Sequence, residues 1–459
     1  MKKFKTISKY ICGILAVIMI STLVSGCSLK SNTSTAPQTF VIWGFDDEDV
    51  WKPYIGEVQT QFLKGYDIKY VKKTLNDSYE NDSLNSIMSG QGPDLWVIPS
   101  DWVYRHKDKL APLPDALAKE LKINIDQQYV PAVKTSVSFD GKIYGLTPTL
   151  ETLLIYYNPK LFQAAADDYI IGHPNASEEE KSAALKLLGS PPITWTDFVE
   201  CVKLLNKKNG NDIIRSGVAM GTSNNIKVSS DLLSLLMMQR GAKMVSDNVD
   251  MATFNLPDQK NELSGKNALD FYASFANPNS PQYSWNSSMP SDIESFVQGK
   301  TAMIFAYPAI ENYFAQLFPN FKDFQGFNMP QIGENNESVI DYGKFNAMVT
   351  PKLSPNTNLA WQFINYMSNP VANSYSNTTR IAQSVKRTDL KPSLRDRGGS
   401  ALGDQTQTAQ GWIKGRYPLN TDNALRSAID SVNTGNQDSK TAIDTAANTI
   451  TNLLREDTW

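Results

Sequence analysis

Short apolar runs alternate with amphipathic stretches between residues 38 and 100. Residues 50–63 and a segment that ends at Gly90 carry apolar side chains at helical spacing and predict two helices. Three apolar runs rich in aromatic and β-branched residues predict strands over residues 40–43, 67–71 and 95–98. The last run is apolar throughout, which is typical of a central strand. This alternation predicts an α/β fold with a mostly parallel sheet.

The same pattern continues through the rest of the chain. Apolar runs predict strands over residues 153–157 and 302–305. Helical spacing predicts helices over residues 195–206, 232–238, 268–275, 293–297 and 359–367. Residues 423–454 predict two amphipathic helices separated at Gly435. The stretch 167–190 is polar and largely helical in pattern, and we expect it to be a solvated insertion.

The N-terminus has the pattern of a secretory signal. Four lysines lie within the first nine residues, and residues 11–24 are mostly apolar. This run is shorter than the about 20 apolar residues that span a bilayer, but it suits the apolar region of a signal peptide. No later stretch approaches 18 consecutive apolar residues, so no further span is predicted.

Cys27 lies directly after this signal. The sequence VSGC at 24–27 resembles the bacterial lipobox, in which the cysteine is lipidated and becomes the new N-terminus. An ordinary cleavage site near a cysteine is the alternative. We predict a lipoprotein signal peptide over residues 1–26, and a lipidated cysteine with a flexible tether over residues 27–37. The body is then anchored on the extracellular face of the cell membrane, or on the periplasmic side in a two-membrane cell.

Composition limits the classes of function. The chain has 44 basic and 47 acidic residues, and the signal removes four lysines, so the body is acidic. An acidic body argues against nucleic acid as a partner. Cys201 is the one cysteine left in the body, which excludes an internal disulfide. The length allows two or three domains.

Common catalytic and cofactor motifs are absent from the sequence. The two histidines, His106 and His173, lie in no zinc or triad motif, and no phosphate-binding glycine loop is present. The acidic run 46–49 lacks the ligand spacing of a calcium loop. It suits either a helix N-terminus or the ligand-binding end of the first strand. We predict no cofactor, no metal site and no catalytic residue.

Five segments in order carry a family resemblance. They are FVIW at 40–43, SGQGPDL at 89–95, DGKIYGL at 140–146 with YYN at 156–158, PITWTDF at 192–198 and FVQGKTAM at 296–303. Together they resemble family 1 extracellular solute-binding proteins, the group that includes maltose-binding protein. The resemblance implies a two-lobed fold of the type II periplasmic binding proteins, closing like a hinge. It implies a first lobe of residues 38–148 plus 331–383 and a second lobe of residues 149–330 plus 384–459.

The resemblance also implies ligand-binding residues. Asp47 follows the first strand, Asp101 follows the third, and Glu151 lies just past the first crossover between lobes. Carboxylates accept paired hydrogen bonds from sugar hydroxyls. The aromatic candidates for stacking on a sugar ring are Trp43, Tyr307 and Trp412.

Each of these residues has a simpler explanation. Asp101 could cap the helix that follows it, and Glu151 could be a surface acid near the hinge. Trp43 and Trp412 could belong to the core. Glu48 stands where maltose-binding protein carries a basic residue, so maltose itself is not predicted.

The resemblance implies a monomeric binding protein that delivers a small solute, a mono- or oligosaccharide, to ABC permease subunits. Two alternatives are a surface-anchored glycoside hydrolase that uses a carboxylate pair such as Asp47 and Glu151, and a sensory or adhesive lipoprotein on the same fold. Aromatics with carboxylates favour a neutral solute, while Arg380 keeps a charged solute open.

Overall fold

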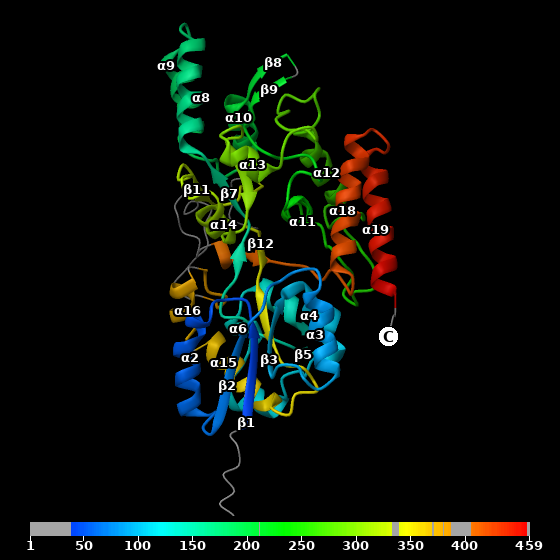
Figure 1. Ribbon diagram of the computed structural model, residues 1–459. Helices are drawn as coiled ribbons and strands as arrows, with labels where there is room; N and C mark the ends of the chain where they lie inside the picture. The colour runs from blue at the N-terminus through cyan, green and yellow to red at the C-terminus, as the bar shows by residue number, and fades with distance from the viewer. Residues whose placement is uncertain are drawn as a thin grey trace, which may run out of the picture.

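The chain forms two lobes, and each has its own β-sheet and hydrophobic core (Figure 1). The computed structural model describes residues 38–210, 212–332, 339–369, 371–379, 381–386 and 405–456. The predicted signal peptide, Cys27, the tether 27–37 and Arg380 lie outside the described residues. Within the described ranges, no helix has the length and apolar character needed to cross a membrane.

The sheet of the first lobe has the strand order β13-β3-β1-β2. β1 (Gln38–Gly44) runs parallel to β2 (Tyr66–Lys72) and to β3 (Leu95–Pro99), which confirms the three predicted strands. β13 (Asn346–Val349) pairs with β3 in the antiparallel direction, although it comes from a distant part of the chain. Local periodicity does not identify a partner at such a sequence separation.

Helices pack around this sheet (Figure 1). Trp51, Trp96 and Trp361 are at most 1% exposed, so these three tryptophans serve as core. The main helices are α2 (Glu48–Gln61), α3 (Tyr79–Met88), α4 (Ser100–His106), α15 (Thr357–Ser368) and α16 (Ala372–Thr379). Smaller elements are η1 (Lys107–Lys109), α5 (Asp115–Glu120), α6 (Ile125–Gln128), α7 (Pro131–Val137), β4 (Ser138–Phe139) and β5 (Lys142–Ile143).

The sheet of the second lobe is antiparallel. β7 (Leu154–Tyr157) lies between β10 (Met303–Ala306) and β11 (Gln325–Phe327), and both neighbours run against it. The prediction of a mostly parallel sheet is therefore wrong for this lobe. The alternation of strands and helices reveals where strands occur, but their direction depends on how long connections fold back.

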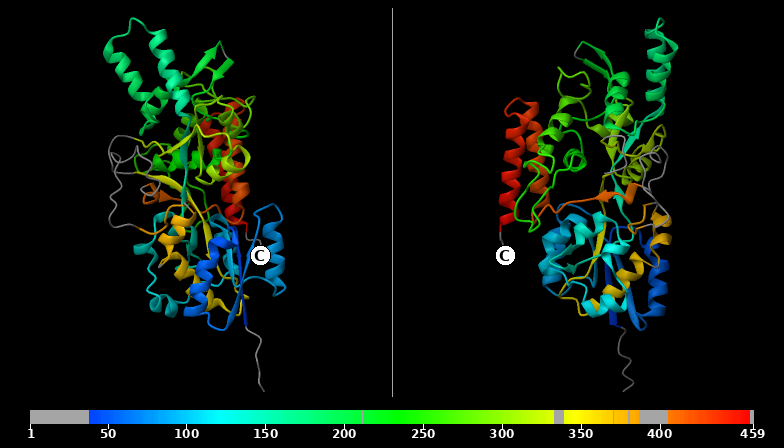
Figure 2. Two further views of the ribbon diagram at one scale, coloured as in Figure 1. Left: turned by 60° about the vertical axis from the view of Figure 1, so that its left-hand side comes forward. Right: turned by 180° about the vertical axis from the view of Figure 1, so that it is seen from behind.

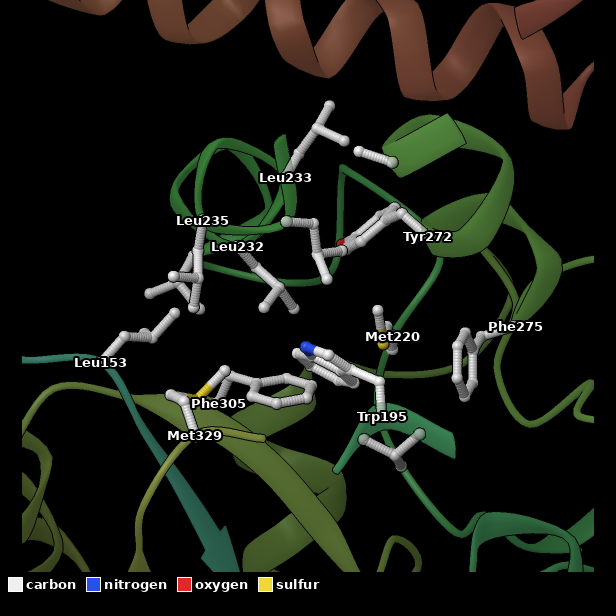
Figure 3. Packing of buried hydrophobic residues seen from close by; sticks show 14 of the residues in the cluster. Leu153, Trp195, Met220, Leu232, Leu233, Leu235, Tyr272, Phe275, Phe305 and Met329 are labelled. Atoms are coloured by element: carbon white, nitrogen blue, oxygen red, sulfur yellow. The ribbon is translucent and has the colours of Figure 1, made fainter. Parts of the chain in front are cut away.

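The second core forms around α10 and α11. Figure 3 shows Trp195 and Phe305 packed below Leu232, and the two rings have centroids 6.3 Å apart. The helices of this lobe are α10 (Trp195–Leu205), α11 (Ser229–Gln239), α12 (Ser264–Ser274), α13 (Asp292–Val297), α14 (Ala309–Leu317), α18 (Pro418–Asn433) and α19 (Ser439–Arg455). A small hairpin, β8 (Lys207–Asn209) with β9 (Asp212–Arg215), lies beside them.

A pair of helices projects from the second lobe (Figure 2). α8 (Pro159–Gly172) leads into α9 (Glu178–Leu187), which begins at a capping box between Ser177 and Glu180. The insertion expected at 167–190 covers the second half of α8 and all of α9. α8 begins earlier than the expected insertion because Phe162 and its neighbours pack into the core.

Three short strands connect the lobes. β6 (Glu151–Thr152), β12 (Asp341–Lys344) and β14 (Ala409–Gln410) form one sheet in the order β14-β12-β6, which we call the hinge sheet. At each strand the chain passes between the cores, since Leu150, Phe345 and Ala409 pack in the first core, whereas Leu153, Tyr342 and Trp412 pack in the second. The chain therefore crosses between the lobes three times, at neighbouring strands.

Two of the predicted lobe boundaries, after residues 330 and 383, lie earlier in the chain than the second and third crossings. Residues on both sides of the boundary after 330, Met329 and Tyr342, pack in the second core. Ser384, just after the other boundary, donates its backbone N–H to the Pro148 carbonyl, and Ala409 packs in the first core. The sequence carries a recognisable motif only at the first crossing, next to β6, so the other two could not be placed as closely.

Replacing Gly265 with alanine is expected to destabilise the second lobe. A Cβ at this position in α12 would lie 2.2 Å from the carbonyl oxygen of Phe254, which is far inside van der Waals contact. Overpacking of this kind costs about 1–3 kcal/mol, and we expect the free energy of unfolding, measured by urea titration, to fall by that amount.

Gly56→Ala is the matched control. Gly56 lies inside α2, and no heavy atom lies within 4 Å of its Cβ position. Alanine there should raise the unfolding free energy by up to about 1 kcal/mol. A Gly265→Ala protein as stable as the wild type would contradict the close packing of α12 on Phe254.

Candidate functional site

A pocket lies where the first lobe meets the hinge. Its cavity volume is about 50 Å³. β1 ends at Gly44, so the next residues reach this pocket at the carboxyl end of the sheet, where α/β folds bind ligands. The pocket is lined by Phe45, Asp46, Trp51, Val97, Thr147, Pro148, Thr149, Leu150, Glu151, Phe345, Asn346, Met348, Tyr375 and Ile381.

Asp46, and not its neighbour Asp47, lines the pocket. The Asp46 carboxylate accepts hydrogen bonds from Trp51 Nε1 at 3.0 Å and from the Tyr375 hydroxyl. The Asp47 side chain is 76% exposed and forms an ion pair with Lys72 at 2.5 Å. The acidic run at residues 46–49 indicates the correct turn, but the sequence does not show which of its carboxylates faces the pocket.

Glu151 connects the first crossing to the second lobe. Its Oε1 accepts the backbone N–H of Ala309, at the start of α14, at 2.7 Å. Burial raises the pKa of the Glu151 carboxyl, and the hydrogen bond from Ala309 partly offsets this. In the antiparallel pairing of β6 with β12, Glu151 lies directly opposite Lys344, so the two side chains lie on the same face of the hinge sheet.

Five charged side chains from both lobes meet beside this pocket, and we call them the interlobe charge cluster. Lys414 Nζ lies 2.7 Å from Asp422, 3.3 Å from Asp231 and 3.7 Å from Asp101. Lys344 Nζ lies 2.8 Å from Asp231 and 3.8 Å from Asp101. Asp101 comes from α4 of the first lobe, whereas Asp231 and Asp422 come from α11 and α18 of the second.

These charges can be buried because ammonium groups and carboxylates lie next to one another. Burial raises the pKa of Asp231, but the ammonium groups of Lys344 and Lys414 outweigh it and lower the pKa to about 2. Burial lowers the pKa of Lys414, whose side chain is 0% exposed, but Tyr342 and the three carboxylates raise it well above its usual value. Asp231 and Lys414 are therefore both ionised at neutral pH.

Tyr307 belongs to the same cluster through its hydroxyl, which donates to Asp231 Oδ2 at 3.1 Å. Burial and the neighbouring Asp231 carboxylate raise the pKa of Tyr307 far above its usual value, so the phenol stays protonated. Lys344 Nζ lies 6.0 Å from the centre of its ring. The structure thus brings three predicted site residues, Asp101, Glu151 and Tyr307, around Lys344.

The two predicted tryptophans lie at the edges of the cores. Trp43 is 7% exposed, and Lys73 Nζ lies 3.8 Å above its ring. Trp412 is 5% exposed, packs in the second core, and has Lys414 Nζ 6.0 Å from its ring centre. Its indole N–H finds no acceptor among the described residues. Neither ring lines the pocket, which favours the core-packing explanation for both.

Sequence reasoning missed Asp46, Asp231, Lys344, Lys414 and Asp422. Asp231 had a usable signal, because it is the one charged residue in the otherwise uncharged helix SSDLLSLLMMQ, all of which is buried. A lone acid on a buried helix requires a cation near it. Lys414, between Ile413 and Gly415, offers no comparable pattern.

In the described part of the chain, no group of three or more histidine, cysteine or acidic side chains could hold a metal ion.

Solved structures share the fold of this chain. The chain is similar to the sugar-binding protein MalE of Xanthomonas citri, with a TM-score of 0.67, 17% identity and coverage of 91% of this chain and 97% of that one. It is equally similar to a cyclo/maltodextrin-binding protein solved with maltotetraose, with a TM-score of 0.67, 17% identity and coverage of 93% and 100%. The fold is that of the two-lobed solute-binding proteins, as the resemblance implied.

Residues 58–382 match the family described as bacterial extracellular solute-binding protein, and the chain belongs to this family. Among curated relatives, the maltodextrin-binding protein MdxE of Bacillus subtilis (strain 168) is 26% identical over 221 residues, which are 46% of this chain and 49% of that protein. The galactooligosaccharide-binding protein of the same strain is 28% identical over 151 residues, covering 31% and 33%. The matches thus span about half the length of these relatives or less.

The low pKa of Asp231 predicts acid sensitivity. A carboxyl whose pKa is lower in the folded than in the unfolded protein stabilises the fold above its unfolded pKa of about 3.9 and loses this contribution as the pH falls toward the folded value. The unfolding free energy of the wild type should therefore drop between pH 4 and about pH 2, by more than that of Asp231→Asn.

Denaturant titrations at several pH values measure this difference. The remaining carboxyls are shared by both proteins, so only the excess slope of the wild type reports on Asp231. Parallel pH profiles for the two proteins would contradict the pairing of Asp231 with both lysines.

Proposed function

We propose that this protein captures a small saccharide, or a related neutral polar solute, between its lobes and delivers it to the permease of an ABC importer. The observation that carries the proposal is the interlobe charge cluster, which joins Asp101 of the first lobe to Asp231 and Tyr307 of the second. It lies beside a pocket that contains Trp51 and Tyr375. The names of the maltodextrin- and galactooligosaccharide-binding relatives support the same class of solute.

The charges of the cluster favour a neutral solute. Three carboxylates face two ammonium groups, and Glu151 lies on the same face of the hinge sheet as Lys344, so negative charge is in excess. An anionic solute would be repelled, whereas hydroxyl groups can donate to carboxylates and accept from ammonium groups.

We propose Asp101, Glu151 and Tyr307 as solute contacts, together with Asp46. Asp101 has ion-pair partners at 3.7 and 3.8 Å, and no described residue donates a hydrogen bond to it. Its oxygens therefore keep lone pairs for hydroxyl groups. Asp47, which pairs with Lys72, and Trp43, which packs in the first core, lie outside this group, and Trp412 packs in the second core near Lys414.

We further propose that the protein binds its solute without chemical turnover. The chain belongs to a family of solute-binding proteins, and its curated relatives are named as binding proteins, which supports this proposal. A glycosidase needs one carboxylic acid free to protonate the leaving group. Release of reducing sugar by the purified protein, lost in Glu151→Gln, would reverse this assignment.

A panel of saccharides tested by thermal shift and calorimetry addresses the function directly. We expect at least one neutral mono- or oligosaccharide to bind with a Kd in the micromolar range and to raise Tm with its concentration. Loss of a hydrogen bond to a charged group costs about 1.5–3 kcal/mol. Asp101→Asn should therefore weaken binding by roughly tenfold or more.

Asp47→Asn is the matched control for Asp101→Asn. It removes the same charge from the same lobe, but its side chain pairs with Lys72 in solvent, so the Kd should change by less than about twofold. Binding of only anionic solutes or oligopeptides across the panel would overturn the saccharide assignment. Equal effects of the two substitutions would overturn the proposed contacts.

We also propose that Cys27 carries the lipid that holds the protein on the extracellular face of the membrane as a monomer. The signal pattern of residues 11–24 and the small residues before Cys27 support this proposal. Replacing Cys27 with serine should abolish incorporation of labelled palmitate and release the protein into the soluble fraction, because a single residue carries the anchor. Ser25→Ala, which keeps a small residue, should leave the protein in the membrane fraction.

A further inference from the structure

A row of charged side chains on α4 contacts the segment that follows the third crossing. Asp101, Arg105 and Asp108 are spaced by four and three residues, so they share one face of α4 and its continuation into η1. Asp101 lies 3.7 Å from Lys414 Nζ, Arg105 donates from Nη1 to the carbonyl of Arg416, and Asp108 accepts from Arg416 Nη2 at 2.7 Å. We call the contacts of these three side chains with residues 414–417 the α4 clasp.

The two sides of the clasp belong to different lobes. α4 is fixed to the first core by Val103. Residues 414–417 lead from β14 into α18, whose Leu425 and Ile429 pack in the second core. The clasp therefore bridges the lobes through side-chain contacts next to the hinge sheet, in addition to the backbone crossings.

Arg105 is also oriented by a contact within its own lobe. Its guanidinium forms an ion pair with Glu80 on α3, and the same carboxylate bonds His106 Nε2 at 2.7 Å. The guanidinium also lies 5.8 Å from the centre of the Tyr417 ring. A donor that is already oriented loses little conformational freedom on forming its hydrogen bond.

We infer that the α4 clasp sets the balance between the closed and open arrangements of the lobes, with Arg105 and Asp108 as positioning residues that hold Lys414 in the interlobe charge cluster. The effect on solute binding rests on the proposed function, whereas the effect on lobe arrangement does not. Because a solute held between the lobes binds the closed arrangement better, any loss of closed population weakens its apparent affinity.

The solvent exposure of the Asp108–Arg416 ion pair limits how far this pair can change the lobe equilibrium. The side chain of Asp108 is 59% exposed and that of Arg416 is 28% exposed, so their ion pair is weak and screened by salt. Exposed pairs of this kind change an equilibrium by about two- to fivefold. A lobe equilibrium near balance responds measurably to such a change.

The test combines Asp108→Asn, Arg416→Gln, the double variant, and the charge-exchanged pair Asp108→Arg with Arg416→Asp. The distance between fluorescent labels, one on each lobe, measures the closed fraction without solute, and calorimetry measures the Kd for the saccharide that the wild type binds. We expect each single variant to lower the closed fraction and to weaken binding about two- to fivefold. The double variant should be no worse than the weaker-binding single variant, and the exchanged pair should recover most of the loss.

Salt provides a readout that a purely structural role would not change. Raising NaCl from about 0.05 M to about 0.5 M should lower the closed fraction of the wild type but leave that of the double variant nearly constant. Asp270→Asn is the control, because Asp270 forms a comparably exposed pair with Lys266 within α12 of one lobe. It should leave both readouts unchanged.

The outcomes separate this inference from the proposed function. If no saccharide binds but the closed fraction falls in the Asp108 and Arg416 variants, the clasp stands and the solute assignment fails. Unchanged closed fractions in both single variants would overturn the clasp, whatever the solute. Tighter binding in the variants would also overturn it, because the contacts would then hold the open arrangement.

Discussion

A lysine ammonium without access to water must be neutralised where it lies, and Lys414 imposes this requirement on both lobes. Its side chain is 0% exposed, and the carboxylates that surround it come from α4, α11 and α18. Leaving a buried charge unpaired costs several kcal/mol. The contact between Asp101 and Lys414 therefore ties the first lobe to the second in their observed relative position.

Under the proposed function, the same charges serve two purposes that compete with each other. An ion pair that holds the lobes together must leave hydrogen-bonding capacity for a hydroxylated solute. The distances are compatible with both purposes, since Asp422 lies at 2.7 Å from Lys414 while Asp101 stays at 3.7 Å. The closer carboxylate neutralises the lysine, and the more distant one keeps its lone pairs. Tyr307 adds a phenol that donates to Asp231 and fixes the orientation of that carboxylate.

The sequence was informative where structure depends on local pattern or on a short motif. It predicted the three parallel strands of the first lobe, the helices α10 and α11, and the two-lobed fold, because each has a periodicity or a recognisable segment. It did not predict β13 in the first sheet or the antiparallel sheet of the second lobe, because strand pairing between distant segments leaves no local trace. In the site, it named Asp47 beside the inward-facing Asp46, and Lys414 was missed because its partners lie on three separate helices.

The pairing of β3 with β13 has a consequence for biosynthesis. One edge of β3 stays uncovered until residues 346–349 have been synthesised, so the first lobe cannot complete its sheet until residues 153–342 of the second lobe have been produced. Contacts between such distant segments also make folding slow. Slow completion delays the compact state, and a chain that stays unfolded for longer is the better substrate for a secretion channel that threads polypeptides. The late strand thus links the topology of the binding fold to the export signal predicted over residues 1–26.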